Sequence, residues 1–284
     1  IFYFISERYR IGNVISRMEA YPPVLSLENT YFDEKKKYKL SDYYVASSFR
    51  STLGTNQKFD YCSAKILKNV IISGARMVWL DVFNSDMTED ADPVVSSGVK
   101  EGGWKLTLNT VPFESCCETI AKTAFTSGFV NNSDDPFFMC INLNTDNNLS
   151  SLKKIKDAIM KHLGPRLLGI DYGFDKVNIA DIPMYKICGG DGKKAKCVII
   201  CSNGFENSDL EEIVNSSWPR NIKKINYRSV DPNVKVTEYI KENSKNLKNF
   251  NNNNITMITP DDNTFFTRQF NPSYSWDTGS QFVF

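Results

Sequence analysis

Few side chains in this sequence have the types and spacing that catalysis requires. The chain has 284 residues but a single histidine, His162. His162 lies in "MKHLGP", at the end of an expected helix, where a cation favourably opposes the helix dipole, so we interpret it as a helix cap. With one histidine and no serine in a nucleophile elbow, neither a Ser–His nor a Cys–His nucleophile is predicted.

Two polar loops have compositions that ligand sites use. "CGGDGKKAK" (188–196) is rich in glycine and lysine, but it lacks the helix-opening Gly-Lys-Ser/Thr and leads into a strand instead of out of one. "SDMTEDAD" (85–92) offers oxygen ligands for calcium, but it lacks the spacing and the glycine of an EF-hand loop. We interpret both segments as solvated loops.

The seven cysteines form no CxxC pair, and most lie inside apolar runs such as "FFMCI" and "KCVIIC". They are Cys62, Cys116, Cys117, Cys140, Cys188, Cys197 and Cys201. This pattern is typical of small buried hydrophobic residues, and it predicts neither a disulfide framework nor a zinc site. We therefore expect an intracellular, reducing compartment.

The composition, with 41% apolar and 24% charged residues, is that of an ordinary soluble globular protein. A formal charge of +1 gives no reason to expect nucleic acid as a partner. No apolar run reaches the ~18 residues of a membrane span. The opening "IFYFISERYR" has two interpretations: a packing segment, which we favour, or the end of a hydrophobic anchor, which would allow peripheral membrane contact.

Strand-like and helical segments alternate along most of the chain. The expected strands are 43–48, 76–83, 92–96, 136–143, 196–201, 222–230, 255–259 and 280–284. Several are nearly continuous apolar runs, as in parallel strands covered on both faces. Eight strands with intervening helices fit a (β/α)8 barrel. A doubly wound open sheet fits the alternation almost as well, and periodicity does not decide between the two.

Helices are expected where apolar residues repeat at intervals of three and four. Such stripes occupy 66–71, 113–124 and 152–163, and glycines at 74, 128 and 164 follow them as stop signals. Pro112 can open the second of these helices as a first-turn proline.

Several blocks together resemble one enzyme family. "LSDYYVASSFRSTL", "ILKNVIISGARMVWLDVF", "DPVVSSG" and "DPFFMCINLN" are similar, in order and spacing, to the X region of eukaryotic phosphoinositide-specific phospholipase C. "ITPDDNTFFTRQFNPSYSWDTGSQFVF" resembles the end of its Y region. The resemblance implies a distorted (β/α)8 TIM-type barrel of the phospholipase-C-like phosphodiesterase kind. Its parts would be an N-terminal extension (1–39), an X-like half (40–201), a short linker or helix (202–219) and a Y-like half (220–284).

The resemblance also implies where the family keeps its catalytic groups. Its first strand ends in His-Asn, and Phe49 and Arg50 occupy those places here. A second catalytic histidine precedes a glycine after the third strand, where this chain has Ser97. Met257 and Thr259 replace an Arg-x-Tyr pair that contacts the inositol phosphate. The phosphate-binding lysines after "KCVII" are also missing.

The calcium ligands implied by the family are changed in the same way. The Glu-x-Asp pair of the second strand is Trp79 and Asp81, and the glutamate of the fourth strand is Asn142. Arg50 takes the place of the ligand asparagine, and its fixed charge could neutralise Asp81. We therefore predict no calcium and no other cofactor, and an Arg50–Asp81 ion pair at the barrel mouth.

These substitutions predict a pseudoenzyme, because phosphodiester cleavage of this type needs a general base, a general acid and a cation. We expect a structural or scaffolding component of a larger assembly with protein partners. One alternative is a module that binds a phosphoinositide or another phosphate ligand without hydrolysis, through Arg50, Asp81 and Arg268. The other is a divergent phosphoric diester hydrolase with relocated catalytic groups. Membrane association and residence in a large particle both stay open.

Overall fold

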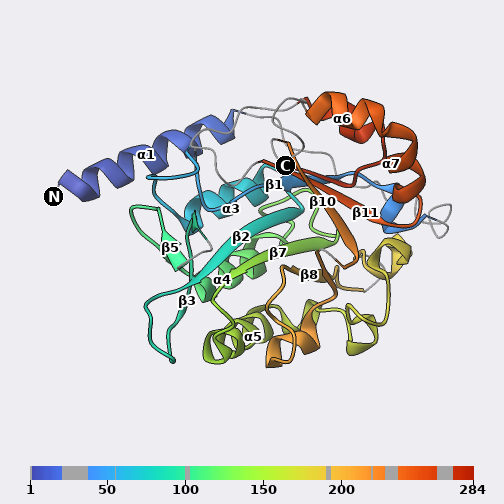
Figure 1. The fold of residues 1–284 in the computed structure, drawn as a ribbon. Helices are drawn as coiled ribbons and strands as arrows, with labels where there is room; N and C mark the ends of the chain where they lie inside the picture. Colours follow the sequence, from blue (N-terminus) through green and yellow to red (C-terminus); the bar gives the residue numbers. More distant parts are fainter. Residues whose placement is uncertain are drawn as a thin grey trace.

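Eight parallel strands form a nearly closed barrel surrounded by helices (Figure 1). The computed structural model describes residues 2–20, 38–54, 56–99, 103–189, 193–218, 220–227, 236–260 and 271–284. The barrel strands are β1 (Val45–Ser48), β2 (Met77–Asn84), β7 (Phe137–Asn144), β8 (Cys197–Cys201), β9 (Ser216–Ser217), β10 (Ile222–Asn226), β11 (Ile255–Thr259) and β12 (Phe282–Val283). They are arranged in the order β10-β11-β12-β1-β2-β7-β8-β9.

The last strand closes the barrel against the first. Val45 of β1 is in register with Phe282 of β12, and β12 also pairs in parallel with β11. This confirms the predicted barrel and rules out the open doubly wound sheet. Within the described residues no ladder joins β9 to β10, and the Asn221 amide instead donates to the Ser217 carbonyl at 3.0 Å. The barrel is therefore distorted at this point.

One of the eight expected strands lies outside the barrel. Residues 92–96 contain β3 (Pro93–Val95), which pairs antiparallel with β2 and with β6 (Val111–Pro112). The missing barrel strand is β9, which lies in the 202–219 segment after the 3₁₀ helix η8 (Asp209–Ile213). Two residues are too few to produce a periodic pattern, and β9 therefore escaped sequence-based detection.

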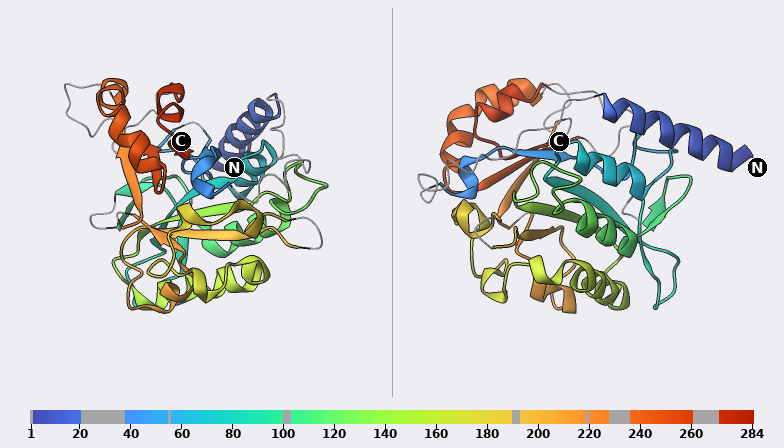
Figure 2. Two further views of the ribbon diagram at one scale, coloured as in Figure 1. Left: turned by 90° about the vertical axis from the view of Figure 1, so that its right-hand side faces the viewer. Right: turned by 180° about the vertical axis from the view of Figure 1, so that it is seen from behind.

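The three helices expected in the first half are present as α3 (Ala64–Ile72), α4 (Phe113–Thr123) and α5 (Leu149–Leu163). They pack side by side over β2, β7 and β8 (Figure 2). The other half carries α6 (Val236–Glu242), α7 (Ser244–Asn251) and the short α8 (Ser273–Trp276). A hairpin of β4 (Gly98–Val99) and β5 (Trp104–Lys105) stands beside the barrel.

Alternating side chains divide the buried apolar residues into an inner core and two outer cores, of which the smaller contains Ile225, Ile240, Leu247 and Ile258. Val78, Leu80 and Val82 of β2 point outward into the core that α3, α4 and α5 cover. Met77 and Trp79 point into the barrel, together with apolar residues of β7, β8, β10, β11 and β12. The period of two in a strand thus gives β2 one buried face toward the helices and one toward the barrel axis.

Short 3₁₀ helices close the amino-terminal end of the barrel. They are η2 (Leu40–Asp42), η4 (Gly164–Arg166), η5 (Ile170–Tyr172), η6 (Ile179–Asp181) and η7 (Met184–Lys186). The Leu40 amide donates to the Ile182 carbonyl at 3.0 Å, and both side chains belong to the inner core. Because Leu40 precedes β1, this layer lies at the amino-terminal ends of the strands, opposite the expected site.

The N-terminal segment forms helix α1 (Phe2–Glu19), which runs alongside α3 (Figure 1). Val14 is buried against the outer core, with Ile11 and Met18 beside it. These contacts lie beyond "IFYFISERYR", in which Ile5 and Tyr9 are 62% and 70% exposed, so the packing interpretation of that stretch stays a prediction. Among the described helices, none combines the length and the apolar character needed to cross a bilayer.

Candidate functional site at the carboxyl end of the barrel

Strand alternation and register bring the predicted site residues together. Trp79 points into the barrel, and Asp81, two residues further along β2, points the same way in the next layer. Asp81 is in register with Asn142 of β7. Phe49 and Arg50 follow β1, the neighbour of β2, so five of the predicted positions converge at one end of the barrel.

The predicted Arg50–Asp81 ion pair is present and buried. Arg50 Nε donates to Asp81 Oδ2 at 2.7 Å, and the two side chains are only 4% and 2% exposed. Arg50 NH1 donates to Gln57 Oε1. The backbone of Arg50 is left-handed, with φ of 46°, a conformation that an L-residue adopts at a cost of about 1–2 kcal/mol. The ion pair therefore holds a strained turn.

The second oxygen of Asp81 is also occupied by donors. Trp79 Nε1 donates to Asp81 Oδ1 at 2.7 Å, and Asn142 Nδ2 donates to the same oxygen at 2.9 Å. Calcium requires several oxygen ligands directed at one point. Here an indole N–H, an amide N–H and a guanidinium all point at the only carboxylate of the cluster. The arrangement does not fit a calcium ion.

Ser97 is fully buried, and its hydroxyl donates to the backbone carbonyl of Gln57. Gln57 therefore links two of the predicted site positions, because its side chain accepts from Arg50 and its backbone accepts from Ser97. Sequence analysis missed this residue, since an isolated glutamine in a loop carries no pattern. Ser97 has neither the acidity nor the solvent access of a proton-transfer group.

Aromatic rings fill the barrel axis beside the ion pair. The Trp79 ring lies 5.2 Å from the Phe49 ring, 4.9 Å from that of Trp218 and 5.7 Å from that of Phe284. Lys224 Nζ lies over Trp79 at 4.8 Å from the ring centroid. Trp218, Phe284 and Lys224 were not predicted, because they come from the second half of the chain and meet Trp79 only in the folded barrel.

Other candidate groups are occupied elsewhere. Met257 belongs to the inner core, and the Thr259 hydroxyl donates to Asn226 Oδ1 at 2.6 Å. His162 lies in the last turn of α5 with Nε2 at 3.1 Å from Glu114 Oε1, on the outside of the molecule. Arg268, predicted as a ligand-binding cation, lies outside the described residues.

All seven cysteines are free and buried, as predicted. Burial raises the pKa of the Cys140 thiol, one layer below Asp81, well above its usual value. The thiol therefore stays protonated at neutral pH, which makes it a poor nucleophile. No group of three or more His, Cys, Asp or Glu side chains suited to a metal ion occurs in the described part of the chain.

Comparison with known proteins agrees with this architecture. Residues 36–172 match the family described as phosphatidylinositol-specific phospholipase C, X domain. No curated protein sequence matches the chain. Among solved structures, the S. officinalis PLC21 crystal structure aligns with a TM-score of 0.65 at 17% identity over 87% of this chain. The L. pealei PLC21 structure has the same TM-score at 16% identity over 87% of this chain.

The chain is therefore phospholipase-C-like, with an X-type region in a barrel of that fold. It spans only 34% of the length of either solved phospholipase C chain. Within that fold, the site residues predicted from the sequence form a buried ion pair and an aromatic cluster.

Proposed function

We propose that this protein is a catalytically inactive phospholipase-C-like barrel that serves as a structural component of a larger assembly. One observation supports this most strongly: the buried Arg50–Asp81 pair fills the place where the family holds calcium. Each proton-transfer group typically contributes about 10²–10⁴-fold to a rate, and Phe49 and Ser97 supply neither base nor acid. The rings of Phe49 and Trp218 pack against Trp79, which supports the view that this position does not receive an inositol ring.

The structural role follows from what the fold retains. The barrel has a continuous strand order, covering helices and well-packed cores, while the predicted site residues that the structure describes are engaged in side-chain packing or hydrogen bonding. A folded barrel without catalytic groups is of use mainly as a surface for protein partners. We place the assembly in a reducing, intracellular compartment, since seven unpaired thiols persist there.

The test is a turnover assay with phosphatidylinositol and phosphatidylinositol bisphosphate vesicles at saturating calcium. We expect no inositol phosphate release above a no-protein blank. Calorimetry with calcium should show no micromolar site, and Asp81→Ala should not change the trace. Turnover that survives repurification would contradict the proposal and favour a divergent hydrolase with relocated groups.

Sizing of a native extract tests the structural role separately. The protein should elute in a large particle, not at the 32.3 kDa of the chain. Titration with soluble inositol phosphates distinguishes the remaining alternative: saturable binding without turnover by the free protein would mean a ligand-binding module in place of a scaffold.

A further inference from the structure

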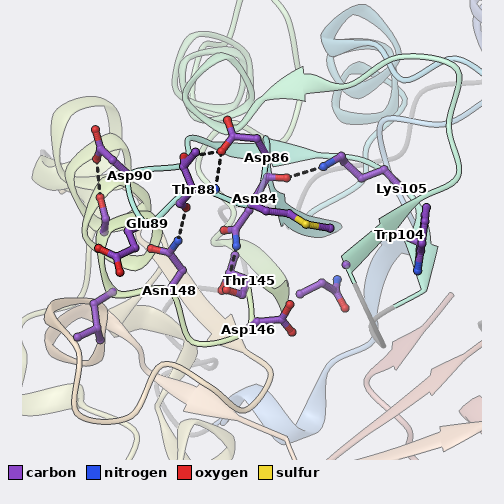
Figure 3. A pocket seen from close by; sticks show the side chains of 15 residues that line it. Asn84, Asp86, Thr88, Glu89, Asp90, Trp104, Lys105, Thr145, Asp146 and Asn148 are labelled. Atoms are coloured by element: carbon purple, nitrogen blue, oxygen red, sulfur yellow. Dashed lines mark hydrogen bonds between the residues drawn. The ribbon is translucent and has the colours of Figure 1, made fainter.

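A large pocket opens beside the filled mouth (Figure 3). Its volume is about 1260 Å³, and its walls come from the carboxyl ends of β2 and β7, the two following loops and the β4–β5 hairpin. None of the residues that line it is Arg50, Asp81 or one of their side-chain partners Gln57, Trp79 and Asn142. The pocket is therefore a separate cavity, beyond the site discussed above.

Hydrogen bonds hold the walls of this pocket in place. Lys105 Nζ donates to the Asn84 carbonyl at 2.6 Å and to the Ser85 carbonyl at 3.1 Å. Asn84 Nδ2 donates to the Thr145 carbonyl at 3.1 Å, and Asn84 Oδ1 accepts from Ser151 Oγ at 2.7 Å. A ligand would meet a preformed cavity and would not have to order its walls.

The charge of the pocket is negative. Asp86, Glu89, Asp90 and Asp146 line it, against the single cation Lys105, whose ammonium already binds two carbonyls. Figure 3 shows these carboxylates distributed around the rim. The lining therefore carries a formal charge of −4 + 1 = −3.

The partners of these carboxylates leave most of that charge available. Asp90 pairs with Lys154 at 2.9 Å. Hydrogen bonds from Thr88 and Ser85 lower the pKa of Asp86, so it stays ionised without a cation in contact. For Glu89 and Asp146 the described residues supply no ion-pair partner.

Two buried side chains that line the pocket carry hydrogen-bond acceptors without a partner in the described part of the chain. Thr145 is only 2% exposed, and its hydroxyl has no hydrogen-bond partner among the described residues. Protein atoms do not enclose this hydroxyl oxygen completely. Asn144, 4% exposed, donates through Nδ2 to the Asn142 carbonyl at 3.2 Å, which leaves Oδ1 unused. A buried polar group without a partner costs free energy, which a donor on a ligand would recover.

Apolar side chains stand at the opening. Met87, Trp104 and Leu149 all line the pocket and are largely exposed. Long cationic side chains bury their aliphatic stems on such surfaces, and an indole face attracts the charged head. The described residues contain no group of three or more His, Cys, Asp or Glu side chains suited to a metal ion, and the carboxylates stand around the rim beside apolar side chains, an arrangement that suits an extended ligand with several positive charges.

We propose that this pocket binds a basic peptide segment of a partner protein, with lysine or arginine heads directed at Asp146, Glu89 and the Thr145 hydroxyl. An adjacent apolar residue of the peptide would pack on Trp104 and Leu149. The proposal goes beyond the inactivity of the barrel and holds whether or not the mouth is catalytic.

The experiment uses the whole protein and a fluorescein-labelled peptide of alternating lysine and leucine, followed by fluorescence anisotropy at 150 mM salt. A matched peptide with glutamate for lysine should not bind. The Glu89→Gln/Asp146→Asn double variant should bind the basic peptide about tenfold more weakly, as expected for the loss of two exposed charge pairs. Trp104→Ala and Thr145→Val, which change no charge, should also weaken binding.

Asp157→Asn is the matched control, because Asp157 is an exposed carboxylate of α5 outside the pocket. It should bind the peptide as the native protein does. Equal weakening by Asp157→Asn and the double variant would mean non-specific attraction and would overturn the proposal. So would an absence of peptide binding, spermine binding as tightly as the peptide, or a saturable calcium site that Asp146→Asn removes.

Discussion

Asp81 is the residue around which the mouth of this barrel is organised. Four donors surround it: the Arg50 and Trp79 nitrogens, the Asn142 amide and the backbone Ser96 amide, which donates at 3.1 Å to the Asp81 carbonyl. Its carboxylate, which the resemblance predicts to stand at a metal-ligand position, is held by three side-chain donors. The left-handed φ of Arg50 is tolerated because its guanidinium is held at both Asp81 and Gln57.

We expect Arg50→Ala to lower the free energy of unfolding by about 3–5 kcal/mol, because it leaves Asp81 buried without its cation. Asp81→Ala should cost a similar amount, and the double variant should cost less than the sum. Urea denaturation of the four proteins measures the coupling. Lys122 and Glu118, an exposed i,i+4 pair at 2.5 Å, provide the control, with an expected coupling of about 0.3–0.5 kcal/mol. Coupling near zero at Arg50 and Asp81 would mean that the buried pair adds no stability.

At the scale of elements, Arg76 joins the start of β2 to its neighbours. Its guanidinium donates to the carbonyls of Ala124, Asp135 and Pro136 at 2.8, 2.6 and 3.3 Å. It therefore connects β2 to the end of α4 and to the segment that enters β7. Burial lowers the pKa of Arg76 to about 10, but the three carbonyls still hold a cation at neutral pH.

Replacement of Arg76 by lysine should destabilise the protein by roughly 2–3 kcal/mol, since a compact ammonium cannot reach three carbonyls and each charge-assisted bond is worth about 1.5–3 kcal/mol. Chemical denaturation measures the difference. Arg8→Lys, on the exposed face of α1, should leave the unfolding midpoint unchanged. An unchanged midpoint in Arg76→Lys would show that these carbonyls are satisfied equally well by the smaller cation.

For the whole molecule, the buried thiols make the free energy of unfolding depend on pH. Burial raises the pKa of Cys62 to about 11 and that of Cys197 to about 12. Thiols in the unfolded chain ionise near pH ~8.5, while those in the native protein stay neutral. The unfolded state therefore binds fewer protons at alkaline pH. This contribution to stability is complete below about pH 8.5 and is lost as the pH rises toward the native pKa values.

We therefore expect the free energy of unfolding to fall between pH 7.5 and pH 9.5 in the presence of a reducing agent, as measured by urea denaturation. Cys116→Ala should reduce the size of that fall, because burial also raises the pKa of Cys116. A thiol reagent at pH 8 should label none of the seven cysteines before unfolding and all of them afterwards. Rapid labelling of the native protein, or a flat pH profile, would contradict this picture.

The sequence by itself determined most of the elements of the first half and the residue types at the barrel mouth. Alternation and apolar runs predicted β2, β7 and β8, and helical spacing predicted α3, α4 and α5, because these local patterns report burial directly. The residue types at the strand ends alone predicted the Arg50–Asp81 pair that the structure contains.

The tertiary structure alone decided how the barrel closes and what fills it. It placed β3 outside the barrel, antiparallel to β2, and it placed β9 in the barrel beside β8. Such pairings depend on backbone hydrogen bonds between distant segments. It also brought Gln57, Trp218, Lys224 and Phe284 to Trp79 and Arg50, and it opened a polar pocket between two loops and a hairpin. Such contacts join residues far apart in the chain, and no local pattern encodes them because they form only when the barrel brings the strand ends together.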